Sequence, residues 1–167
     1  PLEAFYEESF RLIALRSPET VLPDGLEEYY GVEEPLLDDI SLQYQQQTFE
    51  LVRLILDRFH AYDRQALNPD ELITYETYEW YLQDILAMEP FLLYPYPATY
   101  FPTTSVPENL VMLFSDYHPL ETVQDGRDYV ARLHLVDAKL AQLIDGLDAR
   151  QEQGLLPPAF AIDWEVY

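Results

Sequence analysis

The chain has 167 residues, the size of one ordinary domain, and its 49% hydrophobic content can build a sizeable core, so wholesale disorder is excluded. It carries 31 acidic against 9 basic residues, a formal net charge of −22, which argues against nucleic acid and anionic membranes as partners. No cysteine is present, so disulfides, thiolate zinc sites and cysteine nucleophiles are excluded, and no apolar run approaches the roughly 20 residues that span a bilayer. The acidic residues favour a solvated surface over an acidic docking face, and nothing in the sequence assigns a compartment.

Helical signals dominate the first part of the chain. A first helix is predicted over residues 3–16, and "SPET" at 17–20 restarts a helix because proline suits a first helical turn. Residues 21–38 hold two prolines and two glycines and are expected to be irregular. A long helix follows over 41–62, where apolar side chains recur at steps of three, four and seven.

The next long helix is predicted over residues 69–89. Asn68 is placed at its N-cap, a proline follows at the first helical position, and acidic residues occupy the positive helix end. At 100° per residue this helix carries two apolar faces. One holds Tyr75, Tyr78, Leu82, Ile85 and Leu86, and the other holds Ile73, Trp80, Tyr81 and Met88. We therefore expect it to pack between two neighbours.

Residues 90–105, "PFLLYPYPATYFPTTS", combine prolines, which forbid a regular helix, with aromatic residues, which argue against a free linker. We expect a packed irregular segment. Its aromatic side chains are candidates for lining a cleft or contacting a ligand, since tyrosine offers a flat apolar ring with a polar tip. The alternative, which we favour, is that they fill a core between helices. The candidates are Tyr94, Tyr96, Tyr100 and Phe101.

The last part of the chain is predicted to hold a short helix over 107–116 and a long one over 123–153. Gly154, followed by prolines, is a strong C-terminal signal. Leucine, valine and tyrosine side chains at steps of four and three give the long helix one continuous apolar seam. The seam residues are Tyr129, Leu133, Val136, Leu140, Leu143 and Leu147.

These elements predict an all-α fold. We expect one bundle-like helical domain over residues 1–167, with three long helices, shorter helices and the irregular segment rich in proline and aromatic residues. The stretch at the end, "AIDWEVY", has no stop signal, so we expect the chain to be the N-terminal part of a longer protein.

Familiar catalytic signatures are absent. The sequence has no HExxH helix, no phosphate-binding glycine loop and no GxSxG elbow. Two carboxylate–histidine pairs, Asp57 with His60 and His134 with Asp137, have the i, i+3 spacing seen in metal-binding bundles. Most of these side chains fall about 140° or more from the apolar stripe of their own helix, so we interpret them as solvated faces.

The stretch "HPLETVQDGRDYVARL" at 118–133 places His118, Glu121 and Asp125 close together and raises the question of a metal site. A structural interpretation accounts for the acids. Thr122 suits an N-cap and Asp125 the third helical position, as in a capping box, and Glu121 lies near the positive helix end. We assign no metal ligand or catalytic residue in this chain, and only His118 keeps a ligand-facing role as a candidate.

The order of several segments resembles the bacterial domain of unknown function 885 family, over most of the chain. The most distinctive parts are "HPLETVQDGRDYVARL" and "QGLLPP", and they follow "SPET", "LLDDIS" and "NPDELITYETYEWYLQ" in the family's order. The resemblance implies a helical zinc metallopeptidase whose zinc-binding helix lies downstream of these residues. It thus implies zinc and a peptide substrate for the longer protein, with no zinc ligand or catalytic glutamate to carry over to a position here.

Two functions follow as expectations. The first is an N-terminal helical region that lacks the catalytic motif and supports or covers the substrate cleft of a metallopeptidase-like protein, with the remainder of its own chain as partner. The second is a non-catalytic interaction module that holds another protein through its acidic face or the segment 90–105.

Overall fold

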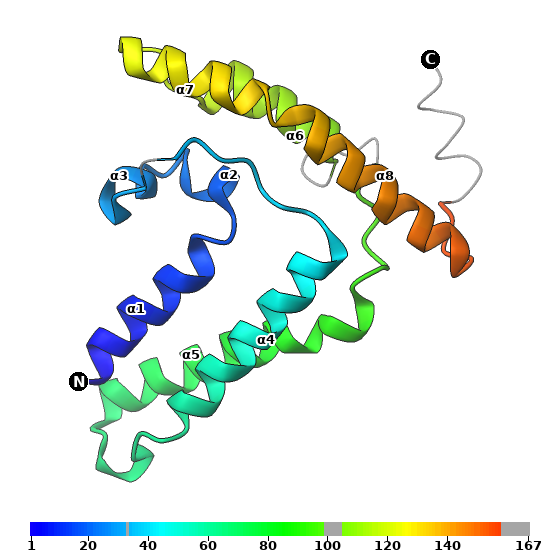
Figure 1. Ribbon diagram of the computed structural model, residues 1–167. Coiled ribbons are helices and arrows are strands. Elements are labelled where there is room, and N and C mark those ends of the chain that lie inside the picture. Colours follow the sequence, from blue (N-terminus) through cyan, green and yellow to red (C-terminus); the bar gives the residue numbers. More distant parts are fainter. Residues whose placement is uncertain (33, 99–104, 158–167) are drawn as a thin grey trace. The chain divides into compact units, whose positions relative to one another are not determined.

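The computed structural model describes residues 1–32, 34–98 and 105–157, and all regular structure in these ranges is helical (Figure 1). The all-α prediction is therefore confirmed. The contacts divide the chain into two compact units, described in turn below. Unit 1 comprises residues 1–16 and 42–92, and unit 2 comprises 17–41 and 93–167. Within the described residues no helix is long and apolar enough to cross a bilayer.

Unit 1 contains the helices α1 (Leu2–Ala14), α4 (Leu42–Phe59) and α5 (Pro69–Ala87), with short 3-10 turns at Arg64–Ala66 and Glu89–Phe91. Helix α4 packs against both α1 and α5. The predicted helices at 3–16, 41–62 and 69–89 are thus present, with ends shifted by at most three residues. Asn68 accepts hydrogen bonds from the backbone N–H groups of Asp70 and Glu71, so a capping box begins α5.

The core of unit 1 is built around Phe59, which is fully buried. Its ring stacks on Tyr75 with a centroid separation of 4.2 Å and also contacts Phe5, Tyr6 and Tyr78. Aromatic pairs of this kind stabilise beyond the area they bury, by about 0.5–1.5 kcal/mol each. Aromatic side chains from three helices therefore fix how α1, α4 and α5 pack.

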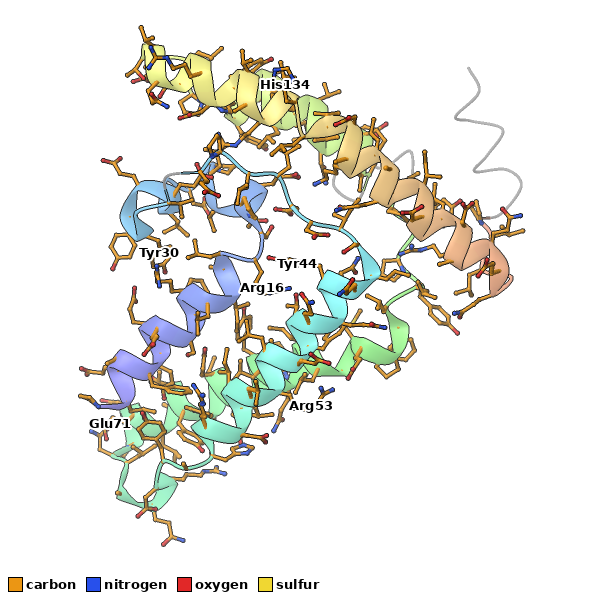
Figure 2. All side chains as sticks on the ribbon, in the orientation of Figure 1. Arg16, Tyr30, Tyr44, Arg53, Glu71 and His134 are labelled. Carbon is orange, nitrogen blue, oxygen red and sulfur yellow. The ribbon has the colours of Figure 1, made fainter. Side chains whose placement is uncertain are left out.

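A cation also joins α1 to α4 in unit 1. The guanidinium of Arg16 lies 3.6 Å from the centre of the Tyr44 ring, and the two labelled side chains point toward one another in Figure 2. Arg16 donates from Nε to the hydroxyl of Thr48 at 2.5 Å and from Nη2 to the carbonyl of Tyr44 at 2.8 Å. This contact fixes the end of α1 against the first turns of α4.

The prediction that α5 is covered on two faces is wrong for one of them. The face through Tyr75 and Leu82 is buried, but Ile73 and Trp80 are 64% and 63% exposed. Within its unit α5 packs against α4 and its own short C-terminal turn, and it contacts α1 through Tyr78. Among the described residues, Tyr81 of this second face packs against the core, whereas Ile73, Trp80 and Met88 remain exposed.

Unit 2 begins with the short helices α2 (Pro18–Val21) and α3 (Leu26–Tyr30). The expectation that 21–38 is wholly irregular was wrong for α3, which has left-handed glycines at both ends, Gly25 and Gly31. Glycine enters this backbone conformation without steric cost, so these residues delimit the helix rather than abolish it.

Helix α6 (Val106–Met112) continues into a π-helical turn, η3 (Leu113–Tyr117). It is followed by α7 (Val123–Leu133) and α8 (Val136–Glu152), which run one after the other with a change of direction between them (Figure 1). The long helix predicted over 123–153 is therefore present as two helices joined end to end, with a short turn at residues 134 and 135 between them. At the division the Leu135 N–H bonds the carbonyl of Arg132 at 2.9 Å, a tightened turn that no proline or glycine marks in the sequence.

The apolar seam predicted along this helix is wrong in part: Leu143 is buried, and Tyr129, Val136 and Leu147 are partly buried. Leu133 and Leu140 are 45% and 37% exposed, whereas the buried stripe lies to one side of them. That stripe combines two small or apolar residues with three cations. Its members are Arg132, Lys139, Leu143, Gly146 and Arg150.

Candidate functional site

Unit 2 contains three buried cations on α7 and α8. Lysine and arginine are seldom buried, and where they are, they require hydrogen-bonding partners. Arg132, Lys139 and Arg150 are 3%, 4% and 6% exposed. Each is bonded to a segment distant in sequence, and together they form the candidate site.

Arg132 lies at the centre of a four-way contact. Its Nη2 donates to both carboxylate oxygens of Glu27 on α3, at 2.7 and 2.8 Å, and its Nε donates to the carbonyl of Leu36 at 3.2 Å. Its Nη1 donates to Nε2 of His118 at 2.7 Å. The planar guanidinium suits such a set because its donors point in fixed directions. One side chain thereby joins α3, the segment before α4, the end of η3 and α7.

This contact selects one tautomer of the His118 ring. Arg132 can only donate, so Nε2 of His118 must accept, and Nδ1 then carries the proton that is donated to the carbonyl of Pro119 at 2.8 Å. The ring is 8% exposed and lies edge-on to Tyr129, with centroids 5.3 Å apart. Both ring nitrogens are therefore hydrogen-bonded within the protein, and the ligand-facing role of His118 stays a prediction.

Lys139 forms the second contact, with Glu19 of α2. The same Glu19 carboxylate accepts the backbone N–H of Asp38 at 3.0 Å, and the Asp38 carboxylate accepts the backbone N–H of Glu19 at 2.9 Å. Ser17 donates to the other Asp38 oxygen at 2.7 Å. This reciprocal arrangement joins the two ends of the segment 17–38 and attaches them to α8.

Arg150 forms the third contact and has no carboxylate partner among the described residues. Its Nε and Nη2 donate to the carbonyl of Pro95, at 3.1 and 2.9 Å, and its Nη1 donates to the carbonyl of Gly146 at 2.7 Å. Burial lowers the pKa of this guanidinium below its ordinary value. A Cβ at Gly146 would lie 3.2 Å from Nη1, so glycine leaves room for the arginine.

The acids of the stretch 118–125 form the start of α7. Thr122 accepts from the backbone N–H of Asp125 at 3.1 Å, and Asp125 accepts from the backbone N–H groups of Thr122 at 2.7 Å and Glu121 at 2.9 Å. Hydrogen bonds from Thr122 lower the pKa of Asp125 below its ordinary value. The geometry is a capping box. At the other end of this helical pair, Gly154 has a φ of 71°, the left-handed conformation.

The aromatic candidates for a cleft are only partly within the described residues. Tyr94 is 65% exposed, Tyr96 is partly buried, and Tyr100 and Phe101 lie outside the described residues. The carbonyl of Pro95, between Tyr94 and Tyr96, is the acceptor of Arg150, so this part of the segment is held to α8.

Neither carboxylate–histidine pair forms a metal centre within the described ranges. His60 is bonded through Nε2 to Glu79 of α5 at 2.7 Å, and His134, at the junction of α7 and α8, is exposed (Figure 2). Nowhere in 1–32, 34–98 or 105–157 do three or more His, Cys, Asp or Glu side chains gather to hold a metal ion. The zinc that the resemblance implies is expected on residues downstream of these ranges, so it stays a prediction.

The described residues define an all-helical protein with an aromatic core in unit 1 and buried, hydrogen-bonded cations in unit 2. Residues 25–165 match the family model described as "Bacterial protein of unknown function (DUF885)", which covers most of the chain. The protein belongs to this family, as the order of its motifs indicated. No curated protein and no solved structure matches the chain.

Proposed function

We propose that this chain is a supporting helical region of a metallopeptidase-like protein, which holds or covers a peptide cleft while residues outside the chain supply zinc and the catalytic groups. One observation supports the supporting role. The Arg132 contact joins four segments of unit 2 through a nearly buried guanidinium, an arrangement suited to presenting a fixed surface. The peptidase part of the proposal rests on the resemblance of the motifs.

The test compares the 167-residue chain with the longer gene product. We expect the longer protein to bind zinc stoichiometrically and to hydrolyse a fluorogenic peptide, and the chain alone to do neither. In the longer protein, Arg132→Met should lower kcat/KM without loss of zinc, because it loosens a support and leaves the metal ligands intact. Hydrolysis by the chain alone, or a longer protein without zinc or activity, would contradict the proposal.

A second candidate function is a helical interaction module, and the exposed face of α5 favours it. Ile73 and Trp80 are seven residues apart, so they lie on one side of the helix, and both are mostly exposed. Sedimentation velocity over a wide concentration range, with Trp80→Gln as the comparison, tests self-association. A monodisperse monomer at all concentrations would count against a module that associates with itself.

A further inference from the structure

A hollow lies in unit 1 between one face of α1 and the C-terminal end of α4. Its volume is about 430 Å³, within the range of sites that hold small ligands. The α1 residues recur at steps of three and four, which places them on one side of that helix. The lining residues are Phe5, Glu8, Ser9, Leu12, Ile55, Arg58, Ala61 and Tyr62.

The apolar walls of this hollow are preformed. The Phe5 ring stacks with Phe59 at 5.7 Å and meets Tyr62 edge-on at 5.4 Å, so its orientation is fixed by the core behind it. Ile55 and Ser9, which also line the hollow, are 4% and 3% exposed. The hydroxyl of Ser9 is already bonded to the Phe5 carbonyl at 2.5 Å and to the Tyr78 hydroxyl, so its polar group is satisfied. A ligand would therefore meet apolar surface here without leaving Ser9 unpaired.

Two opposite charges flank these apolar walls. Glu8 comes from α1 and Arg58 from the last turn of α4, and both are exposed. Neither side chain forms a hydrogen bond or an ion pair with any described residue, and they do not pair with each other. By contrast Arg53 and Arg64 of the same unit each bond a glutamate. The hollow thus offers an unpaired carboxylate and an unpaired guanidinium on different helices.

We propose that this hollow binds a short apolar peptide in its zwitterionic form, of dipeptide size. A ligand with one charge would be attracted by one wall and repelled by the other, and an anion would also be repelled by the net charge of −22. A dipeptide is neutral overall and carries its ammonium and carboxylate at opposite ends. Its ammonium pairs with Glu8, its carboxylate with Arg58, and its apolar side chains cover Phe5, Leu12 and Ile55.

This inference does not depend on the proposed function. It requires no zinc, no hydrolysis and no longer protein, and it concerns unit 1, whereas the buried cations lie in unit 2. Failure of peptide binding would leave the peptidase proposal intact, and failure of the peptidase proposal would leave this one intact.

The test titrates the 167-residue chain with the dipeptide Phe-Leu and follows backbone amide shifts by NMR. We expect saturable shifts at Phe5, Leu12, Ile55 and Tyr62, with a dissociation constant on the order of 1 mM. N-acetyl-Phe-Leu, Phe-Leu amide and Gly-Gly each lack one recognised feature and should bind more weakly. Absence of saturable shifts in the hollow would overturn the proposal.

Two substitutions assign the charges. Glu8→Gln should weaken the binding of Phe-Leu about two- to fivefold and leave the affinity for N-acetyl-Phe-Leu unchanged. Arg58→Gln should weaken the binding of Phe-Leu to a similar extent and leave the affinity for Phe-Leu amide unchanged. Arg127→Gln, at an exposed arginine of α7, is the control and should alter neither. Because the substituted side chains are exposed and unpaired, folding is retained, and the same spectra verify it. Equal weakening of charged and blocked peptides would contradict the assignment.

Discussion

Arg132 donates a hydrogen bond from Nη1 to Nε2 of His118 over 2.7 Å, and both side chains are buried. The arginine cannot accept, so the neutral histidine must carry its proton on Nδ1. We expect ¹⁵N NMR at pH 7.5 to show the Nδ1–H form for His118. The exposed His134 serves as the reference ring, and a protonated Nε2 at His118 would show that the contact does not form.

Loss of the Arg132 guanidinium should strongly destabilise unit 2. Arg132→Met leaves the Glu27 carboxylate and His118 without their partner, and removing one member of a buried pair costs about 3 kcal/mol. Arg127→Met, on the same helix but exposed, should change the free energy of unfolding by less than about 0.5 kcal/mol. Urea denaturation measures both. Similar values for the two variants would mean that the buried contact adds little to stability.

The capping box of α7 should make stability depend on pH. Hydrogen bonds lower the pKa of Asp125 below its ordinary value of 3.8, so the stabilisation is present above that value and is lost as pH falls through the folded pKa. The difference in Tm between the natural protein and Asp125→Ala should therefore be largest above about pH 5 and shrink in acid. Thr122→Ala should raise the Asp125 pKa, as followed by NMR titration. A pH-independent difference would contradict the assignment.

Two helical glycines should respond oppositely to alanine. Gly126 in α7 has open space around it, so Gly126→Ala should stabilise by about 0.5–1 kcal/mol through helix propensity. At Gly146 the new Cβ would lie 3.2 Å from Nη1 of Arg150, a buried group that is bonded to the carbonyls of Gly146 and Pro95. Gly146→Ala should lose that gain or destabilise, as measured by urea denaturation. Equal stabilisation at both sites would show that Arg150 moves freely.

The tyrosines of the unit 1 core should ionise at a higher pH than exposed tyrosines. Burial raises the pKa of Tyr75, Tyr78 and Tyr81 above the ordinary value of 10.0, so folding favours the neutral phenol. The stabilisation is complete below about pH 10 and is lost as pH rises through the folded pKa. In a pH titration followed by phenolate absorbance, a fraction of the tyrosines should therefore ionise at higher pH than the rest. This fraction should disappear in urea, and Tyr78→Phe should reduce it. A single early transition in the folded protein would contradict this.

The positions of the helices could be predicted because hydrophobic periodicity and helix-capping residues are signals carried by neighbouring residues in the sequence. Asn68 and Pro69 sufficed to begin α5, and Thr122 with Asp125 sufficed to begin α7. The division between α7 and α8 could not be predicted, since a tightened turn at Leu135 uses ordinary helix-forming residues.

The buried cations escaped prediction for a different reason. A hydrophobic pattern treats arginine and lysine as outward-facing, so it selected Leu133 and Leu140 in place of Arg132 and Lys139. Only their partners, Glu27 and Glu19, reveal the true inner face, and these lie about a hundred residues earlier in the chain. The seven-residue step from Arg132 to Lys139 was the one local signal, because it keeps both on one side of a helix.

Burial of three of the nine basic residues makes the solvent-exposed surface more negative. Two of these cations neutralise inward-facing glutamates and the third is bonded by carbonyls, so few positive charges are left to balance the outward-facing acids. Added salt should raise the melting temperature by screening this self-repulsion, until the Debye length falls to about 3 Å near 1 M. The mutual repulsion of whole molecules should likewise keep the protein dispersed at neutral pH and bring it out of solution near its isoelectric point.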